Sequence, residues 1–118
     1  MDTQNKTKPC QADFLLAIND TLNVISGKWK LPIIGALLYG KKRFTELERS
    51  IPKITPRMLS KELKDLEMNG IVRRIVYDGM PVSVAYELTH AAESLHEVLY
   101  TMVEWGIQHR KNVMSAAQ

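Results

Sequence analysis

The chain of 118 residues is 45% hydrophobic and 25% charged, an ordinary composition for a single globular domain with a modest core. It holds no apolar run near the ~20 residues of a membrane span, and its polar N-terminus lacks the apolar centre of a signal peptide. We therefore expect a cytoplasmic protein with no membrane partner. Its one cysteine, Cys10, excludes an internal disulfide and a cysteine-rich zinc site. The net charge of +3 weakly favours a polyanionic partner.

The N-terminal third is predicted to hold an arm and two helices. Residues 1–11 are polar and are expected to form a flexible arm. A first helix follows, with Asp13 as its expected N-cap and Ser26–Gly27 as its end. Its apolar side chains recur at spacings of three and four, at Leu15, Ile18, Leu22 and Ile25. The segment Lys28–Gly40 is so rich in apolar residues that we expect a helix buried on most of its circumference.

The middle of the chain predicts two helices joined by a tight turn. After the basic run 41–43, Phe44, Leu47 and Ile51 repeat at i, i+3 and i+7, which indicates a helix of about two turns. Pro52 and Lys53 end it. A second helix should begin with Thr55 as N-cap and Pro56 at its first position, and should stop at Gly70.

The helix after Thr55 is amphipathic, and its solvent face is basic. Leu59, Leu63 and Leu66 share one side. Arg57, Ser60, Lys61 and Lys64 fall on the opposite side, with no acid among them. A tight helical pair whose second helix has this face is typical of a helix-turn-helix that places its second helix in the DNA major groove. A basic face that is merely solvated is the alternative.

Beyond Gly70 the hydrophobic period changes from 3.6 to 2. Residues 71–77 and 82–88 read as two strands, and the turn Asp78–Pro81 between them makes a β-hairpin. Thr89 then caps a long helix to about Arg110, followed by a tail, 111–118. The order predicts a mainly α fold with a small β-hairpin, a winged helix-turn-helix over residues 12–110.

The last helix carries an apolar stripe that so small a domain cannot cover by itself. The stripe runs through Leu88, Ala92, Leu95, Leu99, Met102 and Gly106, and is widened by Val98, Val103 and Trp105. We expect this helix to pack with the first helix and with the same pair of a second subunit, as a homodimer. The alternative is a helix that folds back on its own domain.

Catalytic and metal sites are not indicated. The chain shows no paired acids, phosphate loop or nucleophile elbow, so we do not expect an enzyme or a cofactor. His90, His96 and His109 are spaced so that no two share a helix face, which argues against a metal site. Cys10 is the one reactive candidate, because a thiol at the start of a helix is more readily ionised. An inert cysteine is the alternative.

Four blocks of sequence together resemble the HxlR-type family of bacterial winged-helix regulators, a relative of the MarR group. They are GKWKLPII at Gly27–Ile34, RFTEL at Arg43–Leu47, ITPRMLSKELKDLEMNGIVRR at Ile54–Arg74 and YELT at Tyr86–Thr89. The resemblance implies a dimer built from the first and last helices. It places the helix from Thr55 to about Asn69 in the major groove, and the Asp78–Pro81 tip on the backbone or in the minor groove. It also implies redox sensing by Cys10, since an N-terminal cysteine senses quinones, aldehydes or hypochlorite in some members.

We therefore predict a homodimeric transcription regulator that reads a pseudo-palindromic double-stranded DNA operator and responds to electrophile or redox stress. Bases and groove edges would be contacted by Arg57, Ser60, Lys61, Lys64 and Thr55. Phosphates would be contacted by Lys53, Arg43, Lys42, Arg73 and Arg74. A protein-interaction module that leaves this basic face unused is the alternative function. A small-molecule effector could bind between the dimer helices and the DNA-binding lobe.

Overall fold

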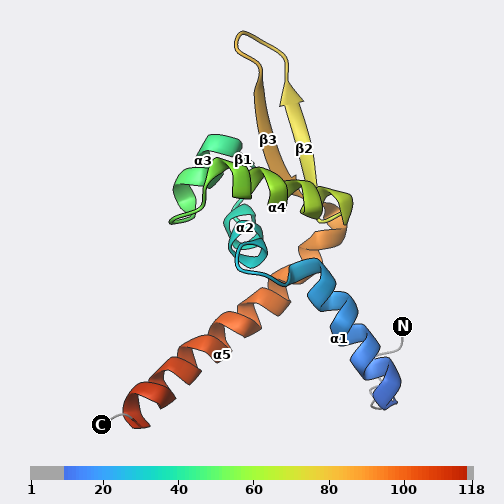
Figure 1. Ribbon diagram of the computed structural model, residues 1–118, viewed down its shortest axis with the longest axis vertical. Helices are drawn as coiled ribbons and strands as arrows, with labels where there is room; N and C mark the ends of the chain where they lie inside the picture. The colour runs from blue at the N-terminus through green and yellow to red at the C-terminus, as the bar shows by residue number, and fades with distance from the viewer. Residues whose placement is uncertain (1–9, 117–118) are drawn as a thin grey trace.

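The structure is a computed structural model that describes residues 10–116. Its elements in chain order are α1 (Gln11–Ile25), α2 (Lys30–Leu37), β1 (Lys42–Arg43), α3 (Phe44–Ser50), α4 (Pro56–Met68), β2 (Val72–Tyr77), β3 (Ser83–Leu88), the 3-10 helix η1 (His90–Ser94) and α5 (Leu95–Ala116). The hairpin projects from one end of the molecule, and α1 and α5 diverge from the other (Figure 1). The predicted winged helix-turn-helix, mainly helical with a small sheet, is confirmed.

The wing is a three-stranded antiparallel sheet in the order β1-β3-β2. The predicted hairpin is present, with Val72 opposite Leu88 and Tyr77 opposite Ser83. Strand β1 was not predicted, because two residues cannot display a period. The basic run before α3 forms it, and Arg43 lies opposite Ala85.

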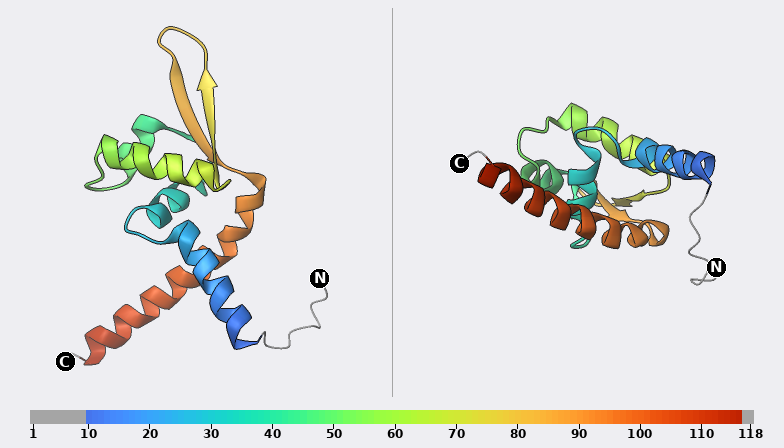
Figure 2. Two further views of the ribbon diagram at one scale, coloured as in Figure 1. Left: turned by 45° about the vertical axis from the view of Figure 1, so that its right-hand side comes forward. Right: turned by 90° about the horizontal axis from the view of Figure 1, so that it is seen from below.

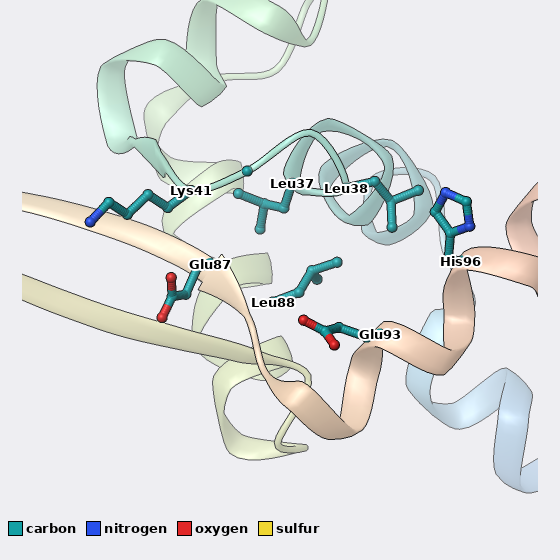
Figure 3. Close-up of a pocket in the computed structure, with 8 residues that line it drawn as sticks. Leu37, Leu38, Lys41, Glu87, Leu88, Glu93 and His96 are labelled. Atoms are coloured by element: carbon teal, nitrogen blue, oxygen red, sulfur yellow. The ribbon is translucent and has the colours of Figure 1, made fainter.

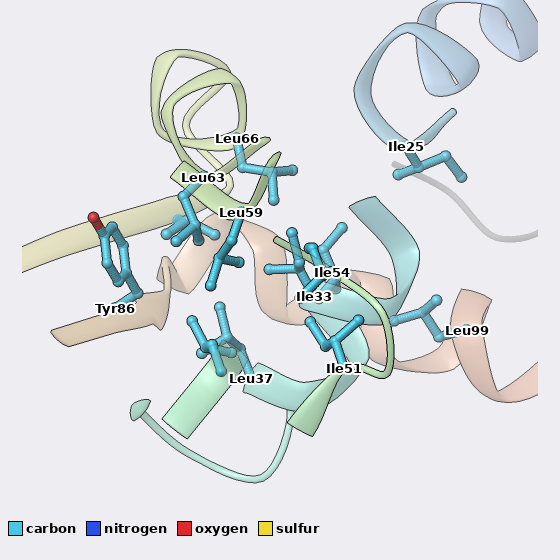
Figure 4. Packing of buried hydrophobic residues seen from close by; sticks show 13 residues of the cluster. Ile25, Ile33, Leu37, Ile51, Ile54, Leu59, Leu63, Leu66, Tyr86 and Leu99 are labelled. Atoms are coloured by element: carbon cyan, nitrogen blue, oxygen red, sulfur yellow. The ribbon is translucent and has the colours of Figure 1, made fainter. Parts of the chain in front are cut away.

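The core lies between α2, α3, α4 and the inner face of the sheet (Figure 4). The three leucines predicted for the buried side of α4 are at most 1% exposed. Helix α2 contributes buried side chains in several directions, as its composition predicted. The fully buried side chains of largest volume are Ile33, Ile34, Leu47, Leu59, Leu63, Leu66 and Val72.

Helix α1 begins earlier than expected. Its N-cap is Cys10, and Asp13 lies within the first turn, so the predicted cap was wrong. A carboxylate in the first turn still stabilises a helix through the helix dipole. Of the expected arm, residues 1–9 lie outside the described residues, while Gln11 is already helical.

The C-terminal helix is longer than expected and leaves the domain. Thr89 Oγ1 accepts a hydrogen bond of 3.2 Å from the Ala92 N–H, which confirms the cap, but the first turns are 3-10. Helix α5 then continues through Lys111 to Ala116, where a tail was expected. It extends away from the core and does not fold back on it (Figure 2). None of the described helices is long and apolar enough to cross a membrane.

Candidate nucleic-acid interface

The turn between α3 and α4 sets the angle of the helix-turn-helix. The Ile54 N–H donates to the Ile51 carbonyl oxygen at 3.4 Å, and Pro52 occupies the second position of this four-residue turn. Lys53 adopts a φ of 69°, the left-handed conformation that the third position of a type II turn requires. Its side chain is exposed at the start of the candidate DNA-binding surface.

Helix α4 starts as its sequence predicted. Thr55 is the N-cap, and its Oγ1 accepts a hydrogen bond of 3.1 Å from the Met58 N–H. Pro56 follows at the first helical position, where the missing N–H costs no hydrogen bond. The Thr55 hydroxyl therefore serves as the N-cap, and it fixes the start of α4. Its oxygen is already engaged in a hydrogen bond within the protein.

The outer face of α4 is exposed and basic. Arg57, Ser60, Lys61 and Lys64 are all exposed, and none of the three cations makes an ion pair among the described residues. The acids Glu62 and Asp65 lie on the flank toward α2. There Lys30 Nζ lies 2.6 Å from Glu62 Oε1 and 3.6 Å from Asp65 Oδ2. Glu62 and Asp65 are thus held beside the basic face, whereas the third acid of α4, Glu67, is exposed near the end of the helix.

The other predicted phosphate contacts fall into two groups. Lys42 and Arg43 lie in β1 immediately before α3, Lys42 half-buried and Arg43 exposed. Arg73 and Arg74 lie at the base of β2 and are exposed. The Arg73 guanidinium pairs with Glu87 on the neighbouring strand, whereas Arg74 makes no ion pair in the described chain. Of these two arginines, Arg74 is therefore the more available for a phosphate contact.

The wing tip differs in character from its base. Residues 75–83 contain one acid, Asp78, and no lysine or arginine. Met80 at the tip is 98% exposed, and Val82 beside it is 61% exposed. The basic residues of the wing therefore lie at its base, near α3 and α4. Two further residues were not among the predicted contacts: Lys41, just before β1, donates a 2.7 Å hydrogen bond from its Nζ to Oη of Tyr77, the last residue of β2.

Comparison with known proteins agrees with this geometry. The model of the family described as HxlR-like helix-turn-helix matches residues 24–114. The chain belongs to this family. An uncharacterized HTH-type transcriptional regulator of Bacillus subtilis (strain 168), YtcD, is 43% identical over 98 residues, which cover 83% of this chain and 78% of YtcD.

Two solved structures of regulators are similar to most of this HxlR-like chain. The redox regulator HypR in its reduced form has a TM-score of 0.79 and 42% identity, covering 84% of this chain and 98% of HypR. The reduced form of the transcriptional regulator YodB from B. subtilis has a TM-score of 0.70 and 37% identity, covering 78% of this chain and 90% of YodB. Family membership makes this chain a transcriptional regulator with a DNA-binding fold, and it argues against an enzyme.

In this HxlR-like chain, Cys10 is exposed and is the N-cap of α1, with no side-chain hydrogen bond at the cap. The expected sensor position is therefore accessible to a small oxidant.

The described residues 10–116 contain no group of three potential metal ligands. Two cavities lie near α5. One, of about 320 Å³, is lined by leucines together with the charged or polar side chains of Lys41, Glu87, Glu93 and His96 (Figure 3). A mainly apolar groove of about 590 Å³ lies between α2 and α5 and includes Leu31, Leu99 and Met102. A small-molecule effector between the dimer helices and the DNA-binding lobe stays a prediction.

Proposed function

We propose that the protein is a homodimeric transcription regulator that binds a pseudo-palindromic DNA operator with α4 in the major groove. The observation that carries this proposal is the exposed, acid-free face of α4, which lies inside a winged helix-turn-helix. A recognition helix presents such a face to base edges and groove-edge phosphates, because arginine and lysine donate to guanine and hydroxyls donate or accept.

The proposed contacts divide by what each side chain can reach. Arg57, Ser60, Lys61 and Lys64 would contact bases or the groove edge, with Thr55 as the cap that orients them. Lys53, Lys42, Arg43 and Arg74 would contact phosphates, which position the protein without reading sequence. Arg73 would contribute less, since Glu87 already engages its guanidinium.

The exposed apolar side chains of α1 and α5 support a homodimer. Along α1, Leu15, Ile18 and Leu22 are each at least 41% exposed. Along α5, Met102, Val103 and Trp105 are exposed too. A second copy of the same pair of helices would bury these faces through a two-fold axis. The two α4 helices would then read half-sites about 34 Å apart, one turn of the duplex.

Alanine substitution at Arg57 and at Lys61 tests the DNA-binding part. We expect each variant to stay a folded dimer and to bind the selected operator more weakly, by about 1–3 kcal/mol for an arginine that makes a bidentate base contact. Lys28→Ala is the matched control, because Lys28 is exposed in the loop between α1 and α2, outside the helix-turn-helix and the wing. Unchanged operator affinity in both variants at fixed salt would refute the assignment.

Salt dependence provides a second measurement. If about six phosphates are contacted per dimer, the slope of log K against log salt should be about −5. A protein-interaction module that leaves the basic face unused would show no such slope and no selected operator. The absence of acids from this face favours DNA over that alternative.

We also propose that Cys10 releases the DNA when it is oxidised or alkylated. Its support is its exposure at the start of α1, together with the similarity of this chain to the redox regulator HypR. Cys10→Ser should bind the operator as the wild type does, but should no longer release it on treatment with diamide or a quinone. Release that persists in Cys10→Ser would dismiss this cysteine as the sensor.

A further inference from the structure

Lys41 and Arg43, beside the base of the wing, form a cluster with Tyr77 at the far end of β2, here called the wing-base cluster after the position of its two cations. The Lys41 ammonium lies 5.3 Å from the centroid of the Tyr77 ring, and its Nζ donates to Tyr77 Oη at 2.7 Å. The Arg43 guanidinium carbon lies 5.9 Å from the centroid of the same ring. Both distances are within the range in which a cation is attracted by an aromatic face. The Tyr77 ring therefore makes cation–π contacts with both Lys41 and Arg43.

The strand order explains why these residues meet. Strand β3 lies between β1 and β2, so Arg43 and Tyr77 come from the two outer strands. Arg43 lies opposite Ala85, and Tyr77 lies opposite Ser83, two residues away on the same face of β3. These central side chains are small, so the arginine can reach the ring across β3. Arg43 also directly precedes α3, which links the wing to the helix-turn-helix.

The charge of the cluster is not balanced by acids. Among residues 10–116, neither Lys41 nor Arg43 makes an ion pair with a carboxylate. Glu87 is near Lys41, but it pairs with Arg73, and the lysine side chain extends past it (Figure 3). Glu46 accepts a hydrogen bond of 2.7 Å from the backbone N–H of Arg43, not from its guanidinium. Two neighbouring cations without an acid repel each other, and an anion between them relieves that repulsion.

We propose that the wing-base cluster binds one backbone phosphate of the DNA that flanks the major-groove site, with Tyr77 as the positioning residue. This inference rests on the proposed DNA-binding function and adds Lys41 and Tyr77 to the contact surface. The Tyr77 hydroxyl accepts from Lys41 and still has its own proton to donate to a phosphate oxygen. A groove of about 370 Å³ opens beside Arg43, where Thr45 and Ser83 supply further hydroxyls. The contact would be independent of DNA sequence, because phosphates are the same at every step.

The salt dependence of DNA binding by the full chain tests this assignment. The variants are Lys41→Gln, Tyr77→Leu and Tyr77→Phe, with Lys28→Gln as a matched exposed-lysine control. Removing one phosphate contact per subunit should make the log–log slope about 1.8 less steep per dimer and weaken binding about tenfold at physiological salt. We expect this change for Lys41→Gln and Tyr77→Leu, equally on the operator and on unrelated DNA. Tyr77→Phe retains the ring beneath both cations, so less than half of the slope change is expected.

The outcomes separate this inference from the proposed function. If Arg57→Ala loses operator affinity while Lys41→Gln and Tyr77→Leu keep the wild-type slope, the wing-base cluster does not bind phosphate. If Tyr77→Phe changes the slope as much as Tyr77→Leu, the ring is not the positioning element. A wild type that binds no DNA would refute the proposed function itself. Thermal unfolding of each variant checks that the wing is intact, and Lys41→Gln keeps the test valid if Tyr77→Leu is unstable.

Discussion

Lys30 Nζ on α2 donates a 2.6 Å hydrogen bond to Glu62 Oε1 on α4. Their side chains are only 14% and 18% exposed, so this ion pair lies largely within the helix packing. It joins the central core helix to the candidate recognition helix, and it draws an acid of α4 away from the basic face. The same contact therefore affects both the stability of the domain and the charge presented to DNA.

We predict that Lys30→Met destabilises the protein by about 1–3 kcal/mol. The methionine replaces much of the apolar stem of Lys30, but it leaves the largely buried Glu62 carboxylate without its partner. Removing one partner of a buried ion pair costs more than the intact pair contributes to stability. Urea unfolding of the variant and of the wild type measures the difference. Lys28→Met, at an exposed position in the adjacent loop, should change stability by less than about 0.5 kcal/mol. Equal stabilities for Lys30→Met and the wild type would contradict the role of the pair.

The same contact predicts a dependence on alkaline pH. The hydrogen bond from Lys30 to Glu62 raises the pKa of Lys30 above its ordinary value of 10.5, although burial opposes the shift. The folded state then holds this proton more tightly than the unfolded state. The stabilisation is therefore complete below the unfolded pKa and is lost as pH rises through the folded pKa. The stability difference between the wild type and Lys30→Met should be constant up to about pH 9.5 and shrink above it. A difference that grows in that range would reverse the sign of the shift.

The cap of α4 gives a further prediction. Thr55→Ala removes the oxygen that accepts from the Met58 N–H, and an N-cap of this kind contributes about 1 kcal/mol. Urea unfolding should show that loss, while Thr55→Ser should retain most of the wild-type stability because it keeps the hydroxyl. A serine variant as unstable as the alanine variant would show that the methyl group, and not the cap, matters here.

Lys53 is the one described non-glycine residue with a positive φ, so its backbone and its charge can be tested separately. Lys53→Ala and Lys53→Gly both remove the charge, but only glycine adopts this conformation without strain. We expect Lys53→Gly to be more stable than Lys53→Ala by about 1 kcal/mol in urea unfolding. Both should weaken DNA binding to the same extent, as the loss of a phosphate contact requires. Equal stability of the two variants would mean that the left-handed turn carries no strain.

Sequence periodicity predicted the elements whose pattern is local. The leucines of α4, the Thr55 cap and the alternation of the wing strands are each set by near neighbours, and each is present. Strand β1 was missed because it is defined by its pairing with β3, and its two residues carry no sequence pattern of their own. The end of α5 was placed too early, because the apolar stripe fades before the polar residues Lys111 and Asn112. No glycine or proline ends the helix there, and it continues to Ala116.

For the candidate site, sequence placed the exposed face of α4 but not the contacts that cross the fold. The spacing of Arg57, Lys61 and Lys64 puts them on one face from helical geometry alone. The partners Lys30 with Glu62 and Lys41 with Tyr77 are separated by more than thirty residues, so only the packed fold brings them together. Hydrophobic periodicity therefore could not predict either contact.

The exposed stripe of α5 yields the test of the homodimer. Met102 is 44% exposed and follows Leu99, which is buried, along the same face of the helix. Met102→Asp would place a charge where a second subunit should bury an apolar side chain, and an unpaired buried charge costs several kcal/mol. We expect sedimentation to show a monomer and operator affinity to fall, because only a dimer engages both half-sites. Circular dichroism should stay that of a folded domain, since this part of α5 lies outside the core.

Thr101→Asp is the matched control for the dimer test. Thr101 precedes Met102 in sequence, but its hydroxyl bonds back to the Glu97 carbonyl oxygen at 3.0 Å, and it lies on the polar side of α5 together with Glu97 and Glu104. An aspartate there adds the same charge to the same turn, but it points about 100° around the helix from Met102 and nearly opposite to Leu99, so a dimer centred on Leu99 and Met102 should persist. A dimer that survives Met102→Asp, or that is lost equally in Thr101→Asp, would show that this stripe is not the interface. The exposed apolar face of α5 would then need a different partner.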